Sequence, residues 1–347
     1  MVHATCLVTG GSGFLGINLI RLLLARGYHV RSLDIADFDY PERDRVGAVR
    51  GDIRDATAVQ HAIIGVDVVV HCAAALPLSS DEEIRSTDVD GTRLLLEVAF
   101  ARGISRFVFI SSTSVYGVPD HSPIVEGDAL HGVGPYGQAK IDAEELCSQY
   151  RARGLCVPVL RPKTFVGPER LGAFELLYDW AFEGRGFPVL GPGDNLYQLL
   201  DVADLCEVIV LCMTLDRAVV NETFNVGAKE FGSMRDNFQA VLDRAGHGRH
   251  VVSLPARPAV LLLRLFAALK LSPLYPWIYE TADHESVVSI ERLRSRLGFT
   301  PRHSNREALE RNYDWYAQHR PEFRDRWGVS HRLPWKRGIL RAVKWAF

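Results

Sequence analysis

Short apolar runs alternate with amphipathic stretches through the first half of the chain. The runs are almost continuously apolar, which is typical of strands buried on both faces of a sheet. Between them, apolar residues recur at the three- and four-residue spacing of a helix. Strands are predicted at residues 5–9, 30–34, 48–50, 67–72, 106–111 and 157–160, and helices at 15–26, 91–102 and 136–153. This order predicts an α/β fold with a doubly wound parallel sheet.

Beyond residue 161 the alternation becomes less regular. Glycine, proline and aromatic residues are concentrated at 187–197. Helices are predicted at 202–213, 234–245 and 258–271, and short strands at 223–226, 251–254 and 287–289. We interpret this half as a smaller α/β lobe that is partly interwoven with the first domain.

A glycine-rich turn connects the first predicted strand to the first predicted helix. Residues 7–16 read L-V-T-G-G-S-G-F-L-G, which places Gly10, Gly13 and Gly16 three residues apart. Glycines here allow a tight turn, close approach of the backbone to a pyrophosphate, and close packing of helix on strand. The N-terminus of the helix adds unpaired N–H groups and a partial positive charge. This arrangement predicts a dinucleotide site on a Rossmann-type sheet.

An acid at the end of the second strand identifies the nucleotide. Asp34 lies 18 positions after Gly16, close to the interval of about 20 at which a carboxylate binds the ribose 2′-hydroxyl of NAD. The same carboxylate repels the 2′-phosphate of NADP, although Arg31 and Arg43 keep NADP as the minority alternative. Farther along, Asp52 and Ile53 are expected to flank the adenine, and residues 73–75 to let the cofactor lie close to the backbone.

A second group of residues carries acid–base chemistry. Tyr136 and Lys140 are four residues apart, so on a helix they share one face. A free tyrosine has a pKa of about 10, but a nearby ammonium and a positive nicotinamide ring both favour the phenolate. The segment S-S-T-S-V-Y-G at 111–117 places hydroxyls at the carboxyl end of the fifth strand, where ligands bind in this architecture.

Together these motifs resemble the extended short-chain dehydrogenase/reductase superfamily, and within it the NAD-dependent epimerase/dehydratase family. The resemblance covers about residues 4–320. It is carried by T-G-G-S-G-F-L-G, G-D-I-R-D, H-C-A-A-A, S-S-T-S-V-Y-G, P-Y-G-Q-A-K, L-R-P-K-T-F-V-G-P and L-L-D-V-A-D-L.

The resemblance implies roles for individual residues. Tyr136 is the expected base or acid, Lys140 its partner and a nicotinamide-ribose ligand, and Ser112 the hydroxyl that bonds the reacting oxygen, with Ser114 as second choice. Pro162 and Thr164 are expected to line the nicotinamide and substrate pocket. The expected cofactor-binding residues are Gly10, Gly13, Phe14, Leu15, Gly16, Asp34, Asp52, Ile53, Ala73, Ala74, Ala75, Lys140, Pro162 and Thr164.

The sequence also departs from the family pattern. The Asp-Glu pair of family dehydratases is replaced by Thr113 and Ser114, which leaves no acid–base pair to expel water. Thr164 stands where sugar-nucleotide epimerases have an asparagine, Tyr197 where they have an arginine, and D-H-E at 283–285 near a second arginine position. Diphosphate recognition relies on such arginines, unless residues such as Arg170, Arg185 or Lys229 replace them.

Composition and charge restrict the partners. The net charge of −2 favours neither nucleic acid nor a membrane, and no cluster has metal-ligand spacing. The cysteines lie in apolar runs without a C-x-x-C pair, and the first strand leaves no room for a signal peptide, so a cytoplasmic protein is expected. These cysteines are Cys6, Cys72, Cys147, Cys156, Cys206 and Cys212.

Two later segments are relevant to whether the protein spans or contacts a membrane. The apolar stretch 259–271 is well short of the roughly 20 residues that a spanning helix needs. The tail 326–347 is basic, contains tryptophans and is amphipathic as a helix, so it can contact the inner membrane face as a peripheral anchor. The competing interpretation is a tail that packs on its own protein or frays.

The sequence therefore predicts an NAD-binding Rossmann domain over 1–165, to which later segments can return, a substrate lobe over 166–325 and the tail 326–347. We expect an epimerase-like oxidoreductase, and not a dehydratase, acting on a sugar nucleotide or glycosyl compound. The alternative is an NAD(P)-dependent dehydrogenase of a hydrophobic alcohol, similar to 3β-hydroxysteroid dehydrogenases. A non-catalytic NAD sensor is disfavoured by the intact Ser112, Tyr136 and Lys140. The resemblance also implies a homodimer formed through helices 91–102 and 136–153.

Overall fold

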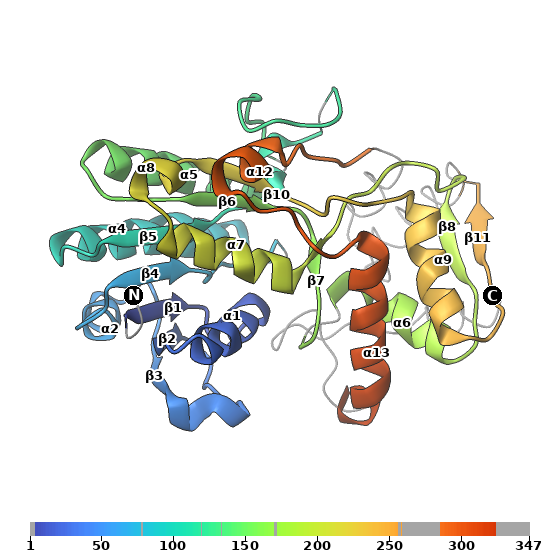
Figure 1. Ribbon diagram of the computed structural model, residues 1–347, viewed down its shortest axis with the longest axis horizontal. Coiled ribbons are helices and arrows are strands. Elements are labelled where there is room, and N and C mark those ends of the chain that lie inside the picture. The colour runs from blue at the N-terminus through green and yellow to red at the C-terminus, as the bar shows by residue number, and fades with distance from the viewer. Residues whose placement is uncertain are drawn as a thin grey trace. The chain divides into compact units, whose positions relative to one another are not determined.

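The computed structural model describes residues 4–323 apart from 78, 119, 133, 170–171, 256–257 and 259–284. The chain divides into two compact units (Figure 1). The first unit comprises Met1–Lys163, Val202–Gly227 and Val288–Thr300, and the second comprises Thr164–Asp201, Ala228–Val287 and Pro301–Phe347. Two segments of the range 166–325, expected for the substrate lobe, thus lie in the first unit.

A seven-stranded parallel sheet forms the centre of the first unit. Its spatial order is β10-β6-β5-β4-β1-β2-β3, and every neighbouring pair is parallel. The predicted α/β class with a doubly wound parallel sheet is confirmed. The strands are β1 (Thr5–Thr9), β2 (His29–Asp34), β3 (Val46–Arg50), β4 (Val68–His71), β5 (Arg106–Ile110), β6 (Val159–Pro162) and β10 (Thr223–Val226).

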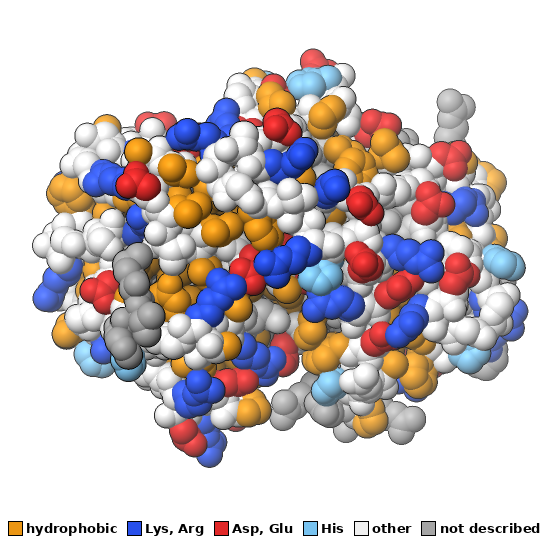
Figure 2. Space-filling view, viewed as in Figure 1, with side chains coloured by type: hydrophobic (Ala, Val, Ile, Leu, Met, Phe, Trp, Pro, Cys, Tyr) orange, Lys and Arg blue, Asp and Glu red, His pale blue; other side chains and the backbone are white. Residues whose placement is uncertain are grey.

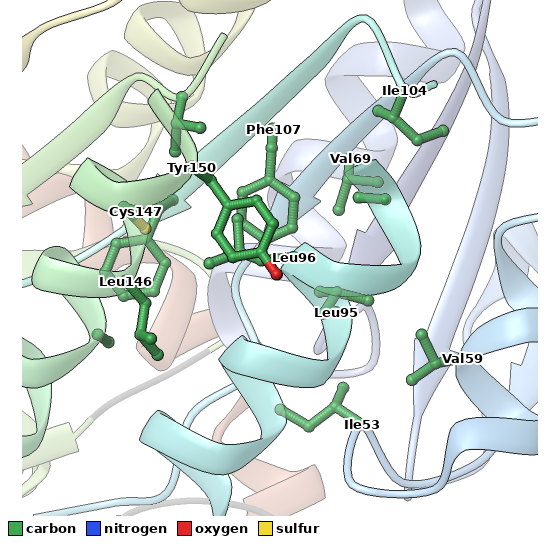
Figure 3. Close-up of a cluster of buried hydrophobic side chains, with 14 of the residues drawn as sticks. Ile53, Val59, Val69, Leu95, Leu96, Ile104, Phe107, Leu146, Cys147 and Tyr150 are labelled. Carbon is green, nitrogen blue, oxygen red and sulfur yellow. The ribbon is translucent and has the colours of Figure 1, made fainter. Parts of the chain in front are cut away.

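Helices cover both faces of this sheet. On one face, α2 (Ala56–Ala62), α4 (Thr92–Ala101) and α5 (Gly134–Ala152) enclose a core in which Leu95, Phe107 and Tyr150 meet (Figure 3). On the other face, α1 (Phe14–Ala25) packs against α7 (Val202–Thr214), and Arg26 pairs with Glu207 at 2.6 Å. The remaining helical segments of this unit are η1 (Pro41–Arg45), α3 (Asp81–Arg85), η2 (Ser86–Gly91), η3 (Thr113–Tyr116), α8 (Arg217–Val220) and α12 (Glu291–Leu297).

The strand order reverses between β1 and β4, and the backbone is tightly packed there. Gly10 has φ +69°, and a Cβ atom on it would lie 2.8 Å from Ala73 N and 2.9 Å from Ala73 Cα. Its N–H donates to the carbonyl of Leu33 (2.9 Å). The turn after β1 is thus held directly against the chain that leaves β4. Ligands of such sheets bind at this reversal point.

A buried chain of hydrogen bonds joins the same two strands. The His71 ring lies between the hydroxyls of Thr9 (Nδ1 to Oγ1, 2.7 Å) and Thr92 (Nε2 to Oγ1, 2.9 Å). Thr92 donates its one hydroxyl proton to the carbonyl of Asp88 (2.6 Å), so it must accept from His71 Nε2–H. Burial, with the Lys140 charge, lowers the pKa of His71 to about 3, so the ring is neutral. With the proton on Nε2, its Nδ1 accepts from the Thr9 hydroxyl.

Two strands predicted in the second half have different outcomes. Residues 223–226 form β10 with the predicted bounds, and β10 pairs with β6 from Thr223 opposite Val159 to Val226 opposite Pro162. Pairing covers the edge that buried, apolar β6 would otherwise expose. Residues 287–289 form no strand, and only the isolated bridge between Ile124 and Val288 is present. The predicted helix at 258–271 and the tail 326–347 lie outside the described residues, apart from Pro258.

The second unit has two small parallel sheets, β8 (Phe187–Leu190) with β11 (Val251–Leu254), and β7 (Phe165–Val166) with β9 (Leu200–Asp201). Aromatic side chains dominate its core, with Tyr178 in contact with the rings of Phe174, Tyr313 and Tyr316. These rings come from its helical segments η4 (Gly172–Phe174), α6 (Glu175–Phe182) and α13 (Asn305–Phe323), which are accompanied by α9 (Met234–Ala245).

Acidic and basic side chains are interspersed over the face shown in Figure 2, consistent with the net charge of −2. No helix in the described ranges combines the length and the apolar character needed to cross a membrane. The helices expected at a dimer interface, 91–102 and 136–153, correspond to α4 and α5. The homodimer itself stays a prediction.

Replacing Gly10 by alanine should destabilise the protein more than the same change at Gly65. Both residues have φ +69°, so both variants incur the left-handed strain of about 1–2 kcal/mol. A Cβ atom on Gly10 would lie 2.8 Å from the backbone nitrogen of Ala73, whereas nothing lies within 4 Å of a Cβ atom on Gly65. Gly10→Ala should therefore lose about 1–3 kcal/mol more in urea unfolding. Equal losses would show that the β1–β4 contact is not tight.

The neutral His71 should make stability depend on pH. A folded pKa of about 3 against 6.5 unfolded means that the unfolded chain binds the extra proton between these values. Stability should therefore be complete above pH 6.5 and fall by about 2 kcal/mol on going from pH 7 to pH 5. In His71→Gln this contribution to the slope of unfolding free energy against pH should disappear. The matched variant at exposed His61, His61→Gln, should keep it; a slope retained in His71→Gln would contradict the assignment.

Candidate active site

The glycine turn and the start of α1 form a compact cradle. A Cβ atom on Gly16 would lie 2.6 Å from Gly11 Cα and would also collide with the Gly10 carbonyl oxygen. One on Gly13 would meet only that carbonyl oxygen, at 3.1 Å. Gly16 therefore permits close packing of helix on turn, while the backbone at Gly13 stays accessible to a phosphate. The first two residues of α1, Phe14 and Leu15, are buried.

Asp34 lies at the carboxyl end of β2 against this turn. Its carboxylate accepts from the Ser12 N–H (3.0 Å) and the Ala36 N–H (2.8 Å). These bonds fix the carboxylate beside the glycine turn, where a ribose would follow the pyrophosphate. Arg31, one of the two arginines that kept NADP as an alternative, donates to the carbonyls of Ala62 (3.1 Å) and Ile64 (2.7 Å). It is therefore occupied at the end of α2.

The other expected cofactor contacts lie on the loops after β3 and β4. The Asp52 carboxylate pairs with Arg54 (2.6 Å), and the Ile53 side chain is buried. The Ala73 N–H donates to Thr9 Oγ1 (3.2 Å), and the Ala75 N–H donates to Asp88 Oδ1 (2.9 Å). The Ala74 side chain is exposed. Both loops leave the sheet on its carboxyl edge, on either side of the glycine turn.

Tyr136 and Lys140 share one face of α5, as their spacing predicts. The Lys140 ammonium lies 5.6 Å from the centre of the Tyr136 ring and 5.3 Å from that of Phe109. Lys140 is only 2% exposed, and Asp88 Oδ2 lies 4.0 Å from its Nζ. Burial by itself lowers the pKa of Lys140, but Asp88, followed by Tyr136, raises it above its ordinary value. A charged ammonium beside the phenol favours the phenolate.

The serine segment after β5 is packed against the same helix. Ser112 Oγ accepts from the Ser114 N–H (3.1 Å) at the start of η3, which leaves its own O–H proton for a ligand. A Cβ atom on Gly137, next to Tyr136, would lie 2.8 Å from the Ser114 carbonyl oxygen. The structure thus brings the Ser112 segment and the Tyr136 turn of α5 into direct contact. Within the described residues, the Ser114 hydroxyl is buried without a hydrogen-bond partner.

A buried ion pair supports this contact and was not predicted from sequence. The Arg161 guanidinium donates to Glu144 at 2.6 and 2.9 Å and to the Tyr116 hydroxyl at 2.7 Å. Glu144 also accepts from the Ser111 hydroxyl (2.5 Å). Strand β6, helix α5 and the serine segment are therefore tied to one another. Arg161 could have been noticed as a charge that follows the apolar run at 157–160.

Two residues that were expected at the diphosphate-contact positions of sugar-nucleotide epimerases lie in the second unit. Thr164 is exposed at its first position, and its side chain forms a hydrogen bond with Tyr197. Burial is the main factor that raises the pKa of the Tyr197 phenol, against the opposing effect of this bond. Pro162 is buried at the end of β6, in the first unit. The 283–284 positions and Arg170 lie outside the described residues.

Comparison with known proteins identifies the family to which this chain is similar. The profile of the NAD dependent epimerase/dehydratase family matches residues 6–227. An uncharacterized protein, y4nG, of Sinorhizobium fredii is 34% identical over 99% of this chain and 86% of its own length.

Relatives with assigned activities include both a sugar-nucleotide enzyme and a steroid enzyme. A dTDP-glucose 4,6-dehydratase of Streptomyces antibioticus is 28% identical over 90% of this chain and 92% of its own. A 3 beta-hydroxysteroid dehydrogenase/Delta 5-->4-isomerase of Mycobacterium tuberculosis is also 28% identical, over 90% of each chain. Overall identity therefore does not separate a sugar nucleotide from a steroid-like alcohol.

The fold agrees with a solved structure. The UDP-glucose 4-epimerase of Thermotoga maritima superimposes with a TM-score of 0.75, covering 90% of this chain and 99% of that one at 22% identity. The cradle that added Cβ atoms would fill, the fixed Asp34 carboxylate and the buried Lys140 all fit the cofactor in the family's description. The chain belongs to the NAD-dependent epimerase/dehydratase family.

Proposed function

We propose that the chain binds NAD and catalyses reversible hydride transfer at a secondary alcohol carbon, without dehydration. The observation that carries this proposal is the buried Lys140 ammonium, 5.6 Å from the ring of Tyr136 on the same face of α5. The serine segment packed on that helix turn supplies the second polar group. NAD, when bound, supplies the carbon that accepts the hydride and returns it.

The chain's own residues have separate roles in this proposal. Tyr136 takes the proton of the substrate hydroxyl during oxidation and returns it during reduction. Lys140 keeps the phenolate accessible near neutral pH, because an adjacent positive charge lowers the phenol's pKa. Ser112 donates its free O–H proton to the reacting oxygen. Thr113 and Ser114, which stand where family dehydratases have acids, provide no carboxylate for eliminating water.

A sugar nucleotide or related glycosyl compound is the first substrate class that we propose. Support comes from the family match and from the relative named dTDP-glucose 4,6-dehydratase. In this version the oxidised intermediate is reduced again on its other face, so NAD is regenerated and not consumed.

A hydrophobic alcohol or ketone is the second class, and a specific observation favours it. Thr164 and Tyr197 occupy the two positions where sugar-nucleotide epimerases have an asparagine and an arginine, and here they bond to each other. Neither supplies the positive charge that recognises a diphosphate. The hydroxysteroid dehydrogenase relative has the same 28% identity to this chain as the dehydratase, and it supports this second class.

A panel of UDP-, GDP- and dTDP-sugars, sterols and isoprenoid alcohols separates the two classes. NADH absorbance should rise in proportion to product for a dehydrogenase. An epimerase should instead convert its sugar without added NAD, and NMR of the product should show the inverted carbon. If no member of either class were converted or reduced, the proposed function would fail.

Replacing Tyr136 by phenylalanine should lower kcat about 10²–10⁴-fold on the substrate so identified, because the proton acceptor is removed. Binding of NAD should change little, which isothermal titration can check. Tyr150→Phe is the matched control, since Tyr150 lies on the same helix but within the hydrophobic core (Figure 3). Turnover of Tyr136→Phe at the rate of Tyr150→Phe would refute the role of the phenol.

Replacing Asp34 by asparagine should weaken NAD binding about tenfold, the effect of losing about 1.4 kcal/mol from a charged hydrogen bond. It should at the same time weaken or remove discrimination against NADP, because the carboxylate no longer repels the 2′-phosphate. Asp37→Asn is the control, as this exposed carboxylate pairs with Arg50 at 3.2 Å. A wild-type protein that binds NADP more tightly than NAD would contradict the assignment of Asp34.

A further inference from the structure

The carboxylate of Asp88 lies beside Lys140 and has no part in the function proposed above. It is 1% exposed and belongs to η2 (Ser86–Gly91), a π-helical segment between α3 and α4. Single π-turns of this kind are frequent at functional sites. Asp88 is thus a charged group buried within the sheet-facing layer of the first unit, where a carboxylate is costly unless it is paired.

The two oxygens of Asp88 face different partners. Oδ1 accepts from the N–H of Ala75 (2.9 Å), on the loop expected to lie against the cofactor. Oδ2 is buried without a hydrogen bond in the described part of the chain, and it lies 4.0 Å from Lys140 Nζ. The carboxylate therefore touches the cofactor loop on one side and faces the ammonium on the other.

The backbone of Asp88 is held by the buried chain described above. Thr92 donates to the Asp88 carbonyl and accepts from His71, which in turn accepts from Thr9 at the end of β1. The position of the carboxylate is therefore fixed from the strand that precedes the glycine turn. The polar side chains of this buried chain are hydrogen-bonded, whereas Asp88 Oδ2 is one of four buried side-chain polar atoms without a partner in the described ranges.

The charged and titratable groups around Lys140 are few. On its own helix these are Tyr136, Glu144 and Cys147, and from β4 and the residue after it, His71 and Cys72. His71 is neutral, and burial raises the pKa of both thiols. Glu144 is bound to Arg161. Asp88 is therefore the carboxylate that compensates the Lys140 charge.

We propose that Asp88 is a positioning residue for the hydride transfer proposed above: its carboxylate keeps the Lys140 ammonium charged and directed toward Tyr136, and ties it to the Ala75 loop. This role rests on the proposed function of Tyr136 and Lys140, but the charge pair itself does not. Burial raises the pKa of the Asp88 carboxyl, whereas Lys140 and the Ala75 N–H oppose this shift and favour the carboxylate. Each member of the pair thus maintains the charge of the other.

Lysine NMR tests the pair without any substrate. The chain contains six lysines, at positions 140, 163, 229, 270, 336 and 344, so a protein labelled at lysine ¹³Cε and saturated with NAD should give a readable spectrum. Lys140→Arg assigns the Lys140 signal. In wild type we expect this signal to keep the ammonium shift beyond pH 10. Lys163 is an internal comparison, because burial lowers its pKa to about 8.

Asp88→Asn keeps the shape and the acceptor for the Ala75 N–H but removes the charge. The Lys140 midpoint should then fall by at least about one pH unit, the usual effect of one opposite charge at this distance. The control is Asp90→Asn, on the same segment, whose half-exposed carboxylate is 3.5 Å from Arg85; it should leave the midpoint unchanged.

An unchanged midpoint in Asp88→Asn would overturn the proposal. If that variant does not fold, the wild-type titration still decides, because a Lys140 midpoint as low as that of Lys163 would also overturn it. Failure of the proposed function has a different signature. Full turnover by Tyr136→Phe would refute the reaction, while a shift of Lys140 in Asp88→Asn would still establish the charge pair.

Discussion

A charged ammonium buried beside a phenol is the interaction on which the rest of this site depends. Burying Lys140 alone would drive off its proton, and a neutral amine could not stabilise a phenolate at Tyr136. The fold compensates with Asp88, whose position is fixed by Ala75, Thr92 and the buried histidine. The same hydrogen bonds hold β1 against β4 at the reversal of strand order. The cofactor cradle and the acid–base pair are therefore parts of one buried structure.

Much of this fold could be predicted from sequence because its signals are local. Residues 5–9, 234–245 and 251–254 have the predicted bounds, since a buried strand or a capped amphipathic helix is defined by its own residues. Residues 223–226 also have the predicted bounds, but their pairing with β6 was not assigned from sequence because it depends on residues more than 60 positions away. The segment 287–289 has the composition of a strand, yet it makes only a single bridge through Val288.

The residues that position the site were harder to find than those that carry the chemistry. The i, i+4 spacing of Tyr136 and Lys140 is recognisable in the sequence, and so is the position of Gly10 between a strand and a helix. Asp88 and His71 have no such spacing to Lys140, because they come from other strands and helices. A histidine that ends the run V-V-V-H and an acid in D-V-D-G-T are visible in the sequence. Only the fold shows that they face one another.

Substrate choice follows a different physical logic from catalysis. Hydride transfer needs a proton acceptor and a nearby ammonium for any secondary alcohol. The residues proposed for catalysis, which lie in the first unit, are therefore independent of the identity of the substrate. Recognition depends on charge, and a diphosphate that loses its water needs cations in return. Thr164 and Tyr197 satisfy each other and provide none. A diphosphate placed against this pair would receive no positive charge from either of these two side chains. The pair therefore favours an uncharged group at that position, whichever of the two substrate classes carries it.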